Sequence, residues 1–221
     1  MHISVIIYPV RKRKYLEDIF YCERKKHHVI IFTEFYPLQN EIGGEYFLKK
    51  MEDYVRSIPD FPEEGIIFRD VTSVLQDADG LKMAIDSMIG LLEGVDFDVV
   101  VGTESRGFMF GVPIAYALSK PFVPARKKGK LPCETISVSY DLEYGSAEVE
   151  MHKDAITPGQ KVVLVDDLIA TGGTIEACAK MVEQLGGEVV KIIFLMELAG
   201  LKGRDKLQKY DVASVITYEG K

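Results

Sequence analysis

Residues 162–174 read VVLVDDLIATGGT, and this stretch decides the fold. Its four apolar residues at 162–165 predict a strand that is buried on both faces, as the strands of a parallel sheet are. Asp166 and Asp167 follow where that strand is expected to end, and a turn of small residues at 170–174 leads onward. A buried strand that runs through such a turn into a helix is typical of an open α/β sheet.

The chain on both sides of this stretch alternates helices with strands. Apolar residues at helical spacing predict a helix over 81–92, and a second helix is predicted over 108–118. Strict alternation over 136–144 and 147–151, with a Gly-Ser turn between them, predicts a β-hairpin. The remaining predicted elements are a helix over 174–185 and strands over 98–102, 122–125, 189–196 and 212–218. We therefore expect an open, mostly parallel, twisted sheet flanked by helices.

The composition excludes several classes of protein. With 221 residues, 47% of them hydrophobic and 28% charged, the chain can bury a sizeable core, which excludes a wholly disordered chain, a collagen and a coiled coil. The sequence contains no run of about 18 apolar residues, so no membrane span is predicted. The cysteines lie far apart and form no CxxC pair, so neither a zinc site nor a disulfide framework is indicated, and we expect a reduced, cytoplasmic location. These cysteines are Cys22, Cys133 and Cys178.

The charge is divided unevenly along the chain. Residues 1–50 hold 9 Lys and Arg against 6 Asp and Glu, a net charge of +3, whereas residues 51–221 hold 18 against 28, a net charge of −10. An acidic main body argues against non-specific binding of nucleic acid. We interpret 51–221 as the main domain. Residues 1–50 are either a basic arm for targeting or binding, a poorly ordered extension, or a stretch translated from a misplaced start, because no periodic apolar face runs through them.

The turn at 170–174 has the features of an anion site. Glycines let backbone N–H groups approach a phosphate closely, the hydroxyls of Thr171 and Thr174 add donors, and the following helix N-terminus adds positive potential. The sequence lacks GxxxxGK[ST] and GxGxxG, which excludes a P-loop and a dinucleotide fingerprint. Asp166 and Asp167 beside such a turn suit the hydroxyls of a sugar phosphate. The alternative is a plain strand–helix turn with Thr174 as the N-cap and the two aspartates merely solvated.

Residues 162–174 resemble the 5-phosphoribosyl-1-pyrophosphate (PRPP) motif of the type I phosphoribosyltransferases. The resemblance implies that the two adjacent acids contact the ribose hydroxyls and that the turn holds the 5′-phosphate. It also implies the fold of that family, an open sheet with a small hood and a mobile β-hairpin loop. The residues concerned are Asp166 and Asp167 for the ribose, and Ala170, Thr171, Gly172, Gly173 and Thr174 for the phosphate.

Further segments of 51–219 resemble the adenine-specific members of that family. FPEEGIIFRD at 61–70 resembles the hood that holds the base, ESRGF at 104–108 the pyrophosphate loop, and RKKGKLP at 126–132 the basic start of the mobile loop. LEYG at 142–145 resembles the tip of that loop, and the segment around 201–204 also fits. The implied base contacts are Ile67, Phe68 and Arg69. The implied contacts to PRPP are Glu104, Ser105, Arg106, Arg126, Lys127 and Lys130, and Glu143 is the implied proton-handling residue.

The resemblance implies a transferase of purine salvage that converts adenine and PRPP into AMP and pyrophosphate. Its implied catalytic residues are Glu143, Asp166, Asp167 and Arg106. Mg²⁺ would arrive on PRPP or pyrophosphate rather than on protein ligands, and the enzyme would be a homodimer without a nucleic-acid or membrane partner. Two alternatives stay open: the base is hypoxanthine, guanine or xanthine, or the chain is a regulator that binds PRPP without turnover. Taken singly, Phe68 could be a core aromatic, Arg106 a surface ion pair, and Glu143 a solvated side chain.

Overall fold

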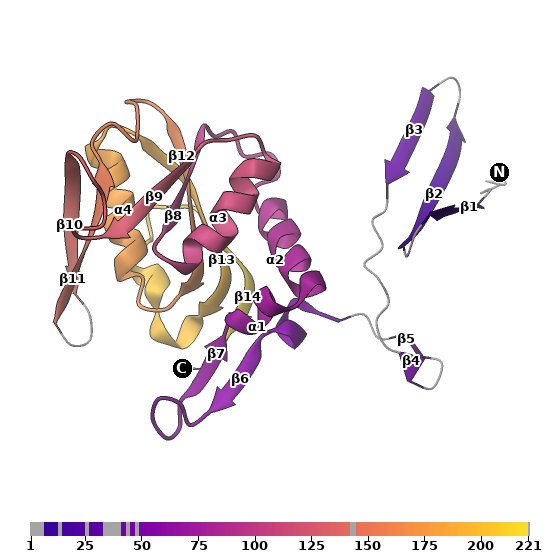
Figure 1. Ribbon diagram of the computed structural model, residues 1–221, viewed down its shortest axis with the longest axis horizontal. Helices are drawn as coiled ribbons and strands as arrows, with labels where there is room; N and C mark the ends of the chain where they lie inside the picture. Colours follow the sequence, from indigo (N-terminus) through magenta and orange to yellow (C-terminus); the bar gives the residue numbers. More distant parts are fainter. Residues whose placement is uncertain are drawn as a thin grey trace. The chain divides into compact units, whose positions relative to one another are not determined.

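The computed structural model describes residues 49–141 and 145–220, with only the backbone of Asp141 (Figure 1). It also describes the backbone of short strands between residues 7 and 46. The chain forms two compact units, Met1–Lys50 and Met51–Lys221. In the first unit three antiparallel strands, β1, β2 and β3, form one sheet, and β4 pairs with β5. Their bounds are Ile7–Lys12, Tyr15–Arg24, His27–Phe32, Glu41–Ile42 and Glu45–Tyr46.

The second unit is built on a seven-stranded sheet with the order β10-β11-β9-β8-β12-β13-β14. Five neighbouring strands of this sheet pair in parallel, in the order β9-β8-β12-β13-β14. The β10–β11 hairpin pairs with β9 in antiparallel fashion. The predicted open, mostly parallel sheet is therefore confirmed. The bounds are Val99–Thr103 for β8, Phe122–Lys127 for β9, Thr135–Asp141 for β10, Ser146–His152 for β11, Lys161–Ile169 for β12, Glu188–Leu198 for β13 and Val212–Tyr218 for β14.

Helices cover both faces of this sheet, as alternate residues of its strands show. Val163 and Val165 of β12 pack into a core with α2 and α3, whereas Val162 and Leu164 pack into a second core with α4. All four side chains are fully buried, which confirms a strand buried on both faces. Figure 1 shows α2 and α3 together, with α4 across the strands from them. The helices span Thr72–Gln76 (α1), Ala78–Gly90 (α2), Arg106–Ala117 (α3) and Gly173–Gln184 (α4), with 3₁₀ turns at Met51–Tyr54 (η1), Ala199–Leu201 (η2) and Gly203–Lys206 (η3). No helix of the described residues is long and apolar enough to cross a membrane.

Several element boundaries differ from those predicted. β12 runs four residues beyond Val165, because β13 continues beside it and pairs as far as Ile169 with Glu197. Asp166 and Asp167 therefore lie inside the strand rather than after it. α2 starts at Ala78 because the carboxylate of Asp77 accepts hydrogen bonds from the N–H groups of residues 79 and 80 at 2.9 and 3.0 Å.

Two further features refine the sequence-based expectations: the start of α4, and the strands of the hood, which was expected at 61–70 without them. α4 begins at Gly173, and its N-cap is Gly172 at φ +76°, so Thr174 is not the N-cap. The short hairpin of β6 (Arg56–Pro59) and β7 (Ile67–Asp70) forms a separate two-stranded sheet. Figure 1 shows it projecting from the body of the second unit, below α1. We call this β6–β7 hairpin the hood.

Candidate active site

The carboxyl ends of two neighbouring strands bring the central residues together. β8 and β12 are parallel, with Gly102 paired to Val165, so the segments that follow both strands meet at one edge of the sheet. α3 begins there with Arg106, whose Nε lies 2.5 Å from the Oδ2 of Asp167. Ligands of open α/β sheets bind at this edge. The geometry thus joins two sequence motifs that lie 61 residues apart.

The two adjacent carboxyl groups have different surroundings. Asp167 is 4% exposed and paired with Arg106, and its N–H donates to the Oδ1 of Asp166 at 2.9 Å. Burial, followed by the charge of Asp167, raises the pKa of Asp166 from 3.8 to about 8. At neutral pH Asp166 therefore carries its proton for most of the time and can donate a hydrogen bond, whereas the Asp167 carboxylate faces a cation.

Gly107 lets α3 approach this pair of carboxyl groups closely. A Cβ atom at this position would lie 2.6 Å from the Oγ1 of Thr103, 2.8 Å from the carbonyl oxygen of Val165 and 3.0 Å from the Oδ1 of Asp166. Real Cβ contacts are longer, so only glycine fits without displacing the end of β8 or β12. The place of Arg106 beside Asp167 thus depends on the next residue having no side chain.

The turn at 170–174 forms a small hollow at the start of α4. The hollow has a volume of about 90 Å³. Gly172, the N-cap of α4, adopts φ +76°, a left-handed conformation that favours glycine, and the first N–H groups of a helix have no partner within the helix. Unpaired N–H groups and the positive end of a helix suit a phosphate monoester. The lining residues are Asp166, Leu168, Ile169, Ala170, Thr171, Gly172, Thr174, Ile175 and Phe194.

The basic segment at 126–132, which begins with the last two residues of β9, is held by two carboxylates. Glu104 accepts hydrogen bonds from Nε and Nη2 of Arg126 at 3.2 and 3.1 Å, and from the N–H of Lys127 at 3.0 Å. Glu150 accepts the N–H groups of Lys130 and residue 131, both at 2.8 Å. Burial acts to raise the pKa of Glu150, but the backbone donors at 129–131 outweigh it and the pKa falls below its ordinary value.

Sequence reasoning missed the role of Glu150. In the predicted strand it belonged to the polar side of an alternating pattern, and nothing in that pattern indicated that the turn at 129–131 would cover it. Glu104 is also an expected contact to PRPP, and in the structure its carboxylate pairs with Arg126 and orients that guanidinium. Ser105 immediately precedes α3, in the segment that joins β8 to this helix, and is exposed.

The hood presents apolar side chains to solvent. Ile67 is 41% exposed and Phe68 37% exposed, and the ring of Phe61 meets that of Phe68 edge-on at 5.3 Å between centroids. The guanidinium carbon of Arg69 lies 4.0 Å from the ring centroid of Tyr218, at the end of β14. The hood is thus tied to the main sheet, while an exposed phenyl face is available for stacking a flat ring.

The base of the hood lies within electrostatic range of the carboxyl edge of the sheet. Its last residue, Asp70, has a lowered pKa, chiefly because the hydroxyl of Thr72 donates to it. The charges of Arg56 and Arg106 act in the same direction. Glu143, the candidate proton-handling residue, lies outside the described residues, between β10 and β11.

The oxygen donors at this edge suit Mg²⁺ that a substrate brings with it. Among residues 49–141 and 145–220 no three His, Cys, Asp or Glu side chains gather as a metal site would require. Mg²⁺ commonly keeps several waters and binds through one or two carboxylates together with substrate phosphates. Asp166 and Asp167 lie beside the phosphate turn, so a Mg²⁺ ion bound to substrate phosphates is compatible with this edge of the sheet.

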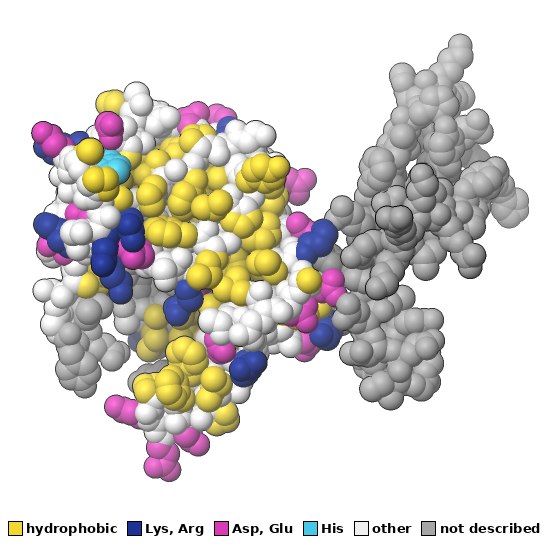
Figure 2. All heavy atoms as spheres, in the orientation of Figure 1, with side chains coloured by type: hydrophobic (Ala, Val, Ile, Leu, Met, Phe, Trp, Pro, Cys, Tyr) yellow, Lys and Arg dark blue, Asp and Glu magenta, His cyan; other side chains and the backbone are white. Residues whose placement is uncertain are grey.

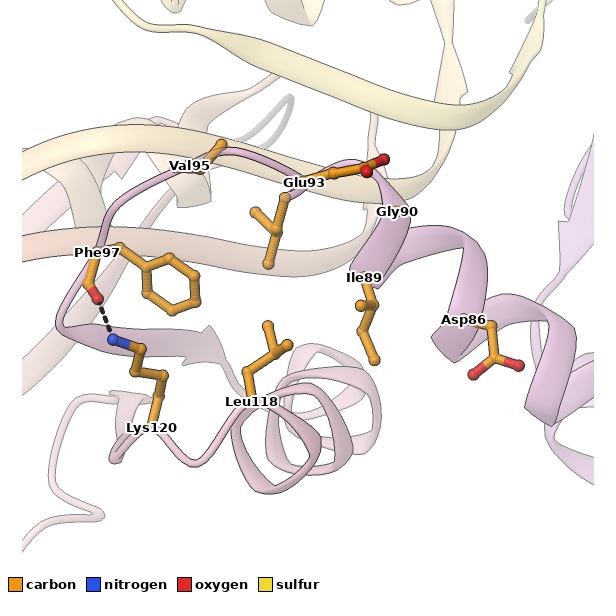
Figure 3. Close-up of a pocket in the computed structure, with 9 residues that line it drawn as sticks. Asp86, Ile89, Gly90, Glu93, Val95, Phe97, Leu118 and Lys120 are labelled. Atoms are coloured by element: carbon orange, nitrogen blue, oxygen red, sulfur yellow. Dashed lines mark hydrogen bonds between the residues drawn. The ribbon is translucent and has the colours of Figure 1, made fainter. Parts of the chain in front are cut away.

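A larger hollow of about 510 Å³ lies elsewhere in the second unit (Figure 3). Ile89 from the end of α2, Val95 and Phe97 from the loop before β8, and Leu118 and Lys120 from the segment before β9 line it, so it lies at the amino ends of the strands. Lys120 Nζ donates to the carbonyl oxygen of Phe97 at 2.5 Å, at one end of the hollow (Figure 3). None of the candidate site residues lines this hollow.

Comparison with known proteins gives a consistent result. The family described as "Phosphoribosyl transferase domain" matches residues 74–219. Adenine phosphoribosyltransferase from Lachnoclostridium phytofermentans is 74% identical over 174 residues, which cover 79% of this chain and 100% of that protein. The relative of the same name from Agathobacter rectalis is 71% identical, with the same coverage.

Solved structures agree with the sequence comparisons. The crystal structure of adenine phosphoribosyltransferase from Thermoanaerobacter pseudethanolicus has 54% identity and a TM-score of 0.73, covering 76% of this chain and 98% of that one. The Saccharomyces cerevisiae enzyme, solved with adenine and an imino-altritol bisphosphate, has 41% identity and a TM-score of 0.70, covering 75% and 96%. The chain therefore belongs to the phosphoribosyltransferase family, among the adenine phosphoribosyltransferases.

Proposed function

We propose that the protein transfers the 5-phosphoribosyl group of PRPP to adenine, giving AMP and pyrophosphate, as a glycosyltransferase of purine salvage. The observation that carries this proposal is the junction of Arg106, Asp166 and Asp167 beside the turn at 170–174. It puts a cation, two hydrogen-bonding carboxyl groups and an anion-binding helix start at one edge of the sheet. That set of groups matches the pyrophosphate, ribose and 5′-phosphate of a single PRPP molecule.

In this proposal the ribose lies against the two acids. Asp166, which keeps its proton, and Asp167, which pairs with Arg106, hydrogen-bond the ribose hydroxyls, and residues 170–174 hold the 5′-phosphate through N–H groups and hydroxyls. The bond from C1′ to the pyrophosphate oxygen breaks as a purine nitrogen attacks C1′, and pyrophosphate takes the bonding electrons. The sugar ring gains positive charge in the transition state, and the nearby carboxylate stabilises it.

Cations stabilise the charge on the departing pyrophosphate. Arg106 contacts it from the start of α3, and Lys127 and Lys130 contact it from the basic segment, with Arg126 held in place by Glu104. Bound Mg²⁺, carried on PRPP, supplies further charge stabilisation for the leaving group. Contacts of this kind explain why an acidic domain keeps several basic residues beside one loop.

The hood and the hairpin tip act on the base. Phe68 stacks on adenine, and the backbone groups of Ile67 and Arg69 read its edge; the exposed phenyl face of the hood supports this assignment. Glu143 takes or stabilises the proton that the base loses as it becomes a nucleoside nitrogen. Closure of residues 127–145 over the site excludes water, which would otherwise compete for C1′.

The proposal includes a homodimer in the cytoplasm. α3 exposes Met109, Val112 and Tyr116 at 46%, 48% and 87%, and their spacing puts them on one side of the helix. Figure 2 shows apolar side chains gathered over this part of the second unit. A helix face of this kind supports an interface between two copies. Residues 51–221 form the catalytic domain, and residues 1–50 are an extension that it does not need; the family match at 74–219 lies within the second unit.

A competition assay tests the choice of base. The full chain is given PRPP, Mg²⁺ and equal concentrations of adenine, hypoxanthine, guanine and xanthine, and the nucleotides formed are separated by chromatography. AMP is expected to exceed each other nucleotide by at least about a hundredfold, since a site that hydrogen-bonds a base edge rejects analogues that leave its groups unpaired. Comparable formation of IMP, GMP or XMP would contradict the assignment to adenine. Binding of PRPP without any nucleotide would favour a regulator.

A further inference from the structure

A segment far along the chain packs directly against the turn at 170–174. A Cβ on Gly172 would lie 2.5 Å from the carbonyl oxygen of Gly203, and a Cβ on Gly203 would collide with the carbonyl oxygen of Ala170. Gly203 would also place that atom 3.1 Å from the backbone nitrogen of Gly172. The two backbones therefore touch with no side chain between them. Any shift of residue 203 is transmitted to the turn.

An ion pair holds the residue next to Gly203. Nε of Arg204 donates to both carboxylate oxygens of Glu197 at 2.8 and 2.9 Å, and Nη2 donates to Oε2 at 2.6 Å. Nη1 donates to the carbonyl oxygen of Val212 at 2.7 Å. The hydroxyl of Ser214 also donates to Glu197, at 3.1 Å. Because Nε, Nη1 and Nη2 all donate hydrogen bonds, both the position and the orientation of the Arg204 guanidinium are fixed.

Glu197 is placed so that the pair is rigid. It lies near the carboxyl end of β13, is 7% exposed, and pairs in register with Ile169 at the end of β12. The hydrogen bonds from Arg204 lower its pKa, and burial only partly opposes them. A buried carboxylate keeps its partner because an unpaired charge there would be costly. The strand that carries Asp166 and the carboxylate that anchors Arg204 thus belong to one continuous sheet.

The same segment is anchored at its other end. Lys209 Nζ and the hydroxyl of Tyr210 both donate to Glu183, near the end of α4, at 2.8 and 2.9 Å. Leu207 is buried in the core beneath α4. The segment therefore spans from β13 to α4, and Gly203 is the point at which it meets the turn that begins α4.

We propose that Arg204 and Glu197 are positioning residues for the 5′-phosphate, because their ion pair presses Gly203 against residues 170–172 and keeps the N–H groups of the turn converging on one point. Neither side chain contacts the substrate. The proposal rests on the proposed function in that it takes this turn as the phosphate site. It predicts a defect confined to the phosphate end of the substrate.

The test compares Arg204→Lys and Glu197→Gln with the unmodified full chain. Lysine keeps the charge but loses the forked geometry, and glutamine keeps the volume but loses the charge. Calorimetry gives the Kd for ribose 5-phosphate, and initial rates give the KM for PRPP and, at saturating PRPP, the KM for adenine. Thermal unfolding shows that each variant is folded. The control is Lys161→Met, which removes an ion pair with Asp96 at the opposite end of β12.

Arg204→Lys is expected to raise the Kd for ribose 5-phosphate and the KM for PRPP about tenfold or more, because small displacements of binding groups weaken binding strongly. Glu197→Gln acts in the same direction, and the KM for adenine stays within about twofold in both. The control changes none of the three.

Two results overturn the positioning role: folded variants whose Kd for ribose 5-phosphate stays within twofold, or variants in which the affinities for phosphate and adenine fall equally. If the unmodified chain binds ribose 5-phosphate but makes no AMP, the proposed reaction is wrong. The variants still decide the positioning role in that case, since the Kd for ribose 5-phosphate needs no turnover.

Discussion

At the scale of single residues, two neighbouring aspartates differ because only one of them faces a cation. Asp167 pairs with Arg106, whereas Asp166 is held at a raised pKa by burial and by its neighbour. Nothing in the letters DD distinguishes them. The difference comes from α3, whose first residue arrives beside the second aspartate only when β8 and β12 are paired.

The raised pKa of Asp166 has a measurable effect on stability. Below about pH 4 the Asp166 carboxyl is protonated in both the folded and the unfolded chain. Between about pH 4 and pH 8 only the folded chain keeps the proton. The free energy of unfolding therefore falls as the pH rises through this range. Above about pH 8 the penalty is constant. Asp166→Asn removes this ionisation penalty. The free energy of unfolding of the variant, relative to the unmodified chain, should therefore increase by at most ~1.4 kcal/mol per pH unit between about pH 4 and pH 8.

Chemical denaturation at several pH values checks this expectation. Asp154→Asn, which changes an exposed carboxyl, is the control and should give a difference nearly independent of pH. A stability difference for Asp166→Asn that does not change between about pH 5 and pH 8 would show that the carboxyl is not protonated in the folded protein.

Gly107 is a residue at which the site tolerates little change. Gly107→Ala should destabilise the protein by about 1–3 kcal/mol, because the added methyl group meets two oxygens and a hydroxyl at less than contact distance. It should also lower kcat/KM by displacing Arg106. Gly90→Ala at the end of α2, where an added Cβ meets nothing within 4 Å, is the matched control and should be neutral or slightly stabilising. Urea denaturation of both variants would decide, and equal stabilities would contradict the packing argument.

At the scale of elements, the basic segment depends on a carboxylate that lies under it. Glu150→Ala leaves the N–H groups of Lys130 and residue 131 without their acceptor, which should cost about 1–3 kcal/mol of stability. The KM for PRPP should rise, and the KM for adenine should not. Glu134→Ala removes an exposed partner of Lys153 and serves as the control for both measurements. An unchanged KM for PRPP in Glu150→Ala would mean that the segment does not act on the substrate.

Most elements of the second unit could be predicted from the sequence, since burial on one or both faces imposes a clear period. The exceptions have physical reasons. The hood strands were not predicted because they form an isolated hairpin with little burial. The predicted end of β12 came too early because pairing with β13 extends the strand beyond its apolar run. α4 starts at Gly173 rather than at the predicted Thr174, with Gly172 as its N-cap, and Gly172 packs against Gly203, a contact between distant segments.

The candidate site was predictable in its parts and not in its connections. The turn at 170–174 and the adjacent acids could be identified because glycines and hydroxyls before a helix have a known use with anions. The carboxylates that hold the basic segment, and the Arg204–Glu197 pair, could not. Their partners are fixed only when segments far apart in the chain come together, and no local pattern records that.

At the scale of the whole molecule, the apolar side of α3 predicts a change of assembly on substitution. The double variant Val112→Glu/Tyr116→Glu should be a monomer by light scattering if two copies meet there, because four like charges would be buried in a symmetric interface. Lys180→Glu on α4 is the control and should leave the mass unchanged. A dimer that survives the double variant would place the interface elsewhere, and a monomeric unmodified chain would contradict the proposed assembly.

The most direct measurement is the formation of AMP from adenine and PRPP by purified protein with Mg²⁺, followed by chromatography. It is run on residues 1–221, on residues 51–221 and on the Asp167→Asn variant of the full chain. The account predicts AMP and pyrophosphate in equal amounts from the first two at similar rates, and a rate lower by at least about a hundredfold from the variant, whose fold is checked by circular dichroism. No AMP from the unmodified chain, or full activity in Asp167→Asn, would contradict it.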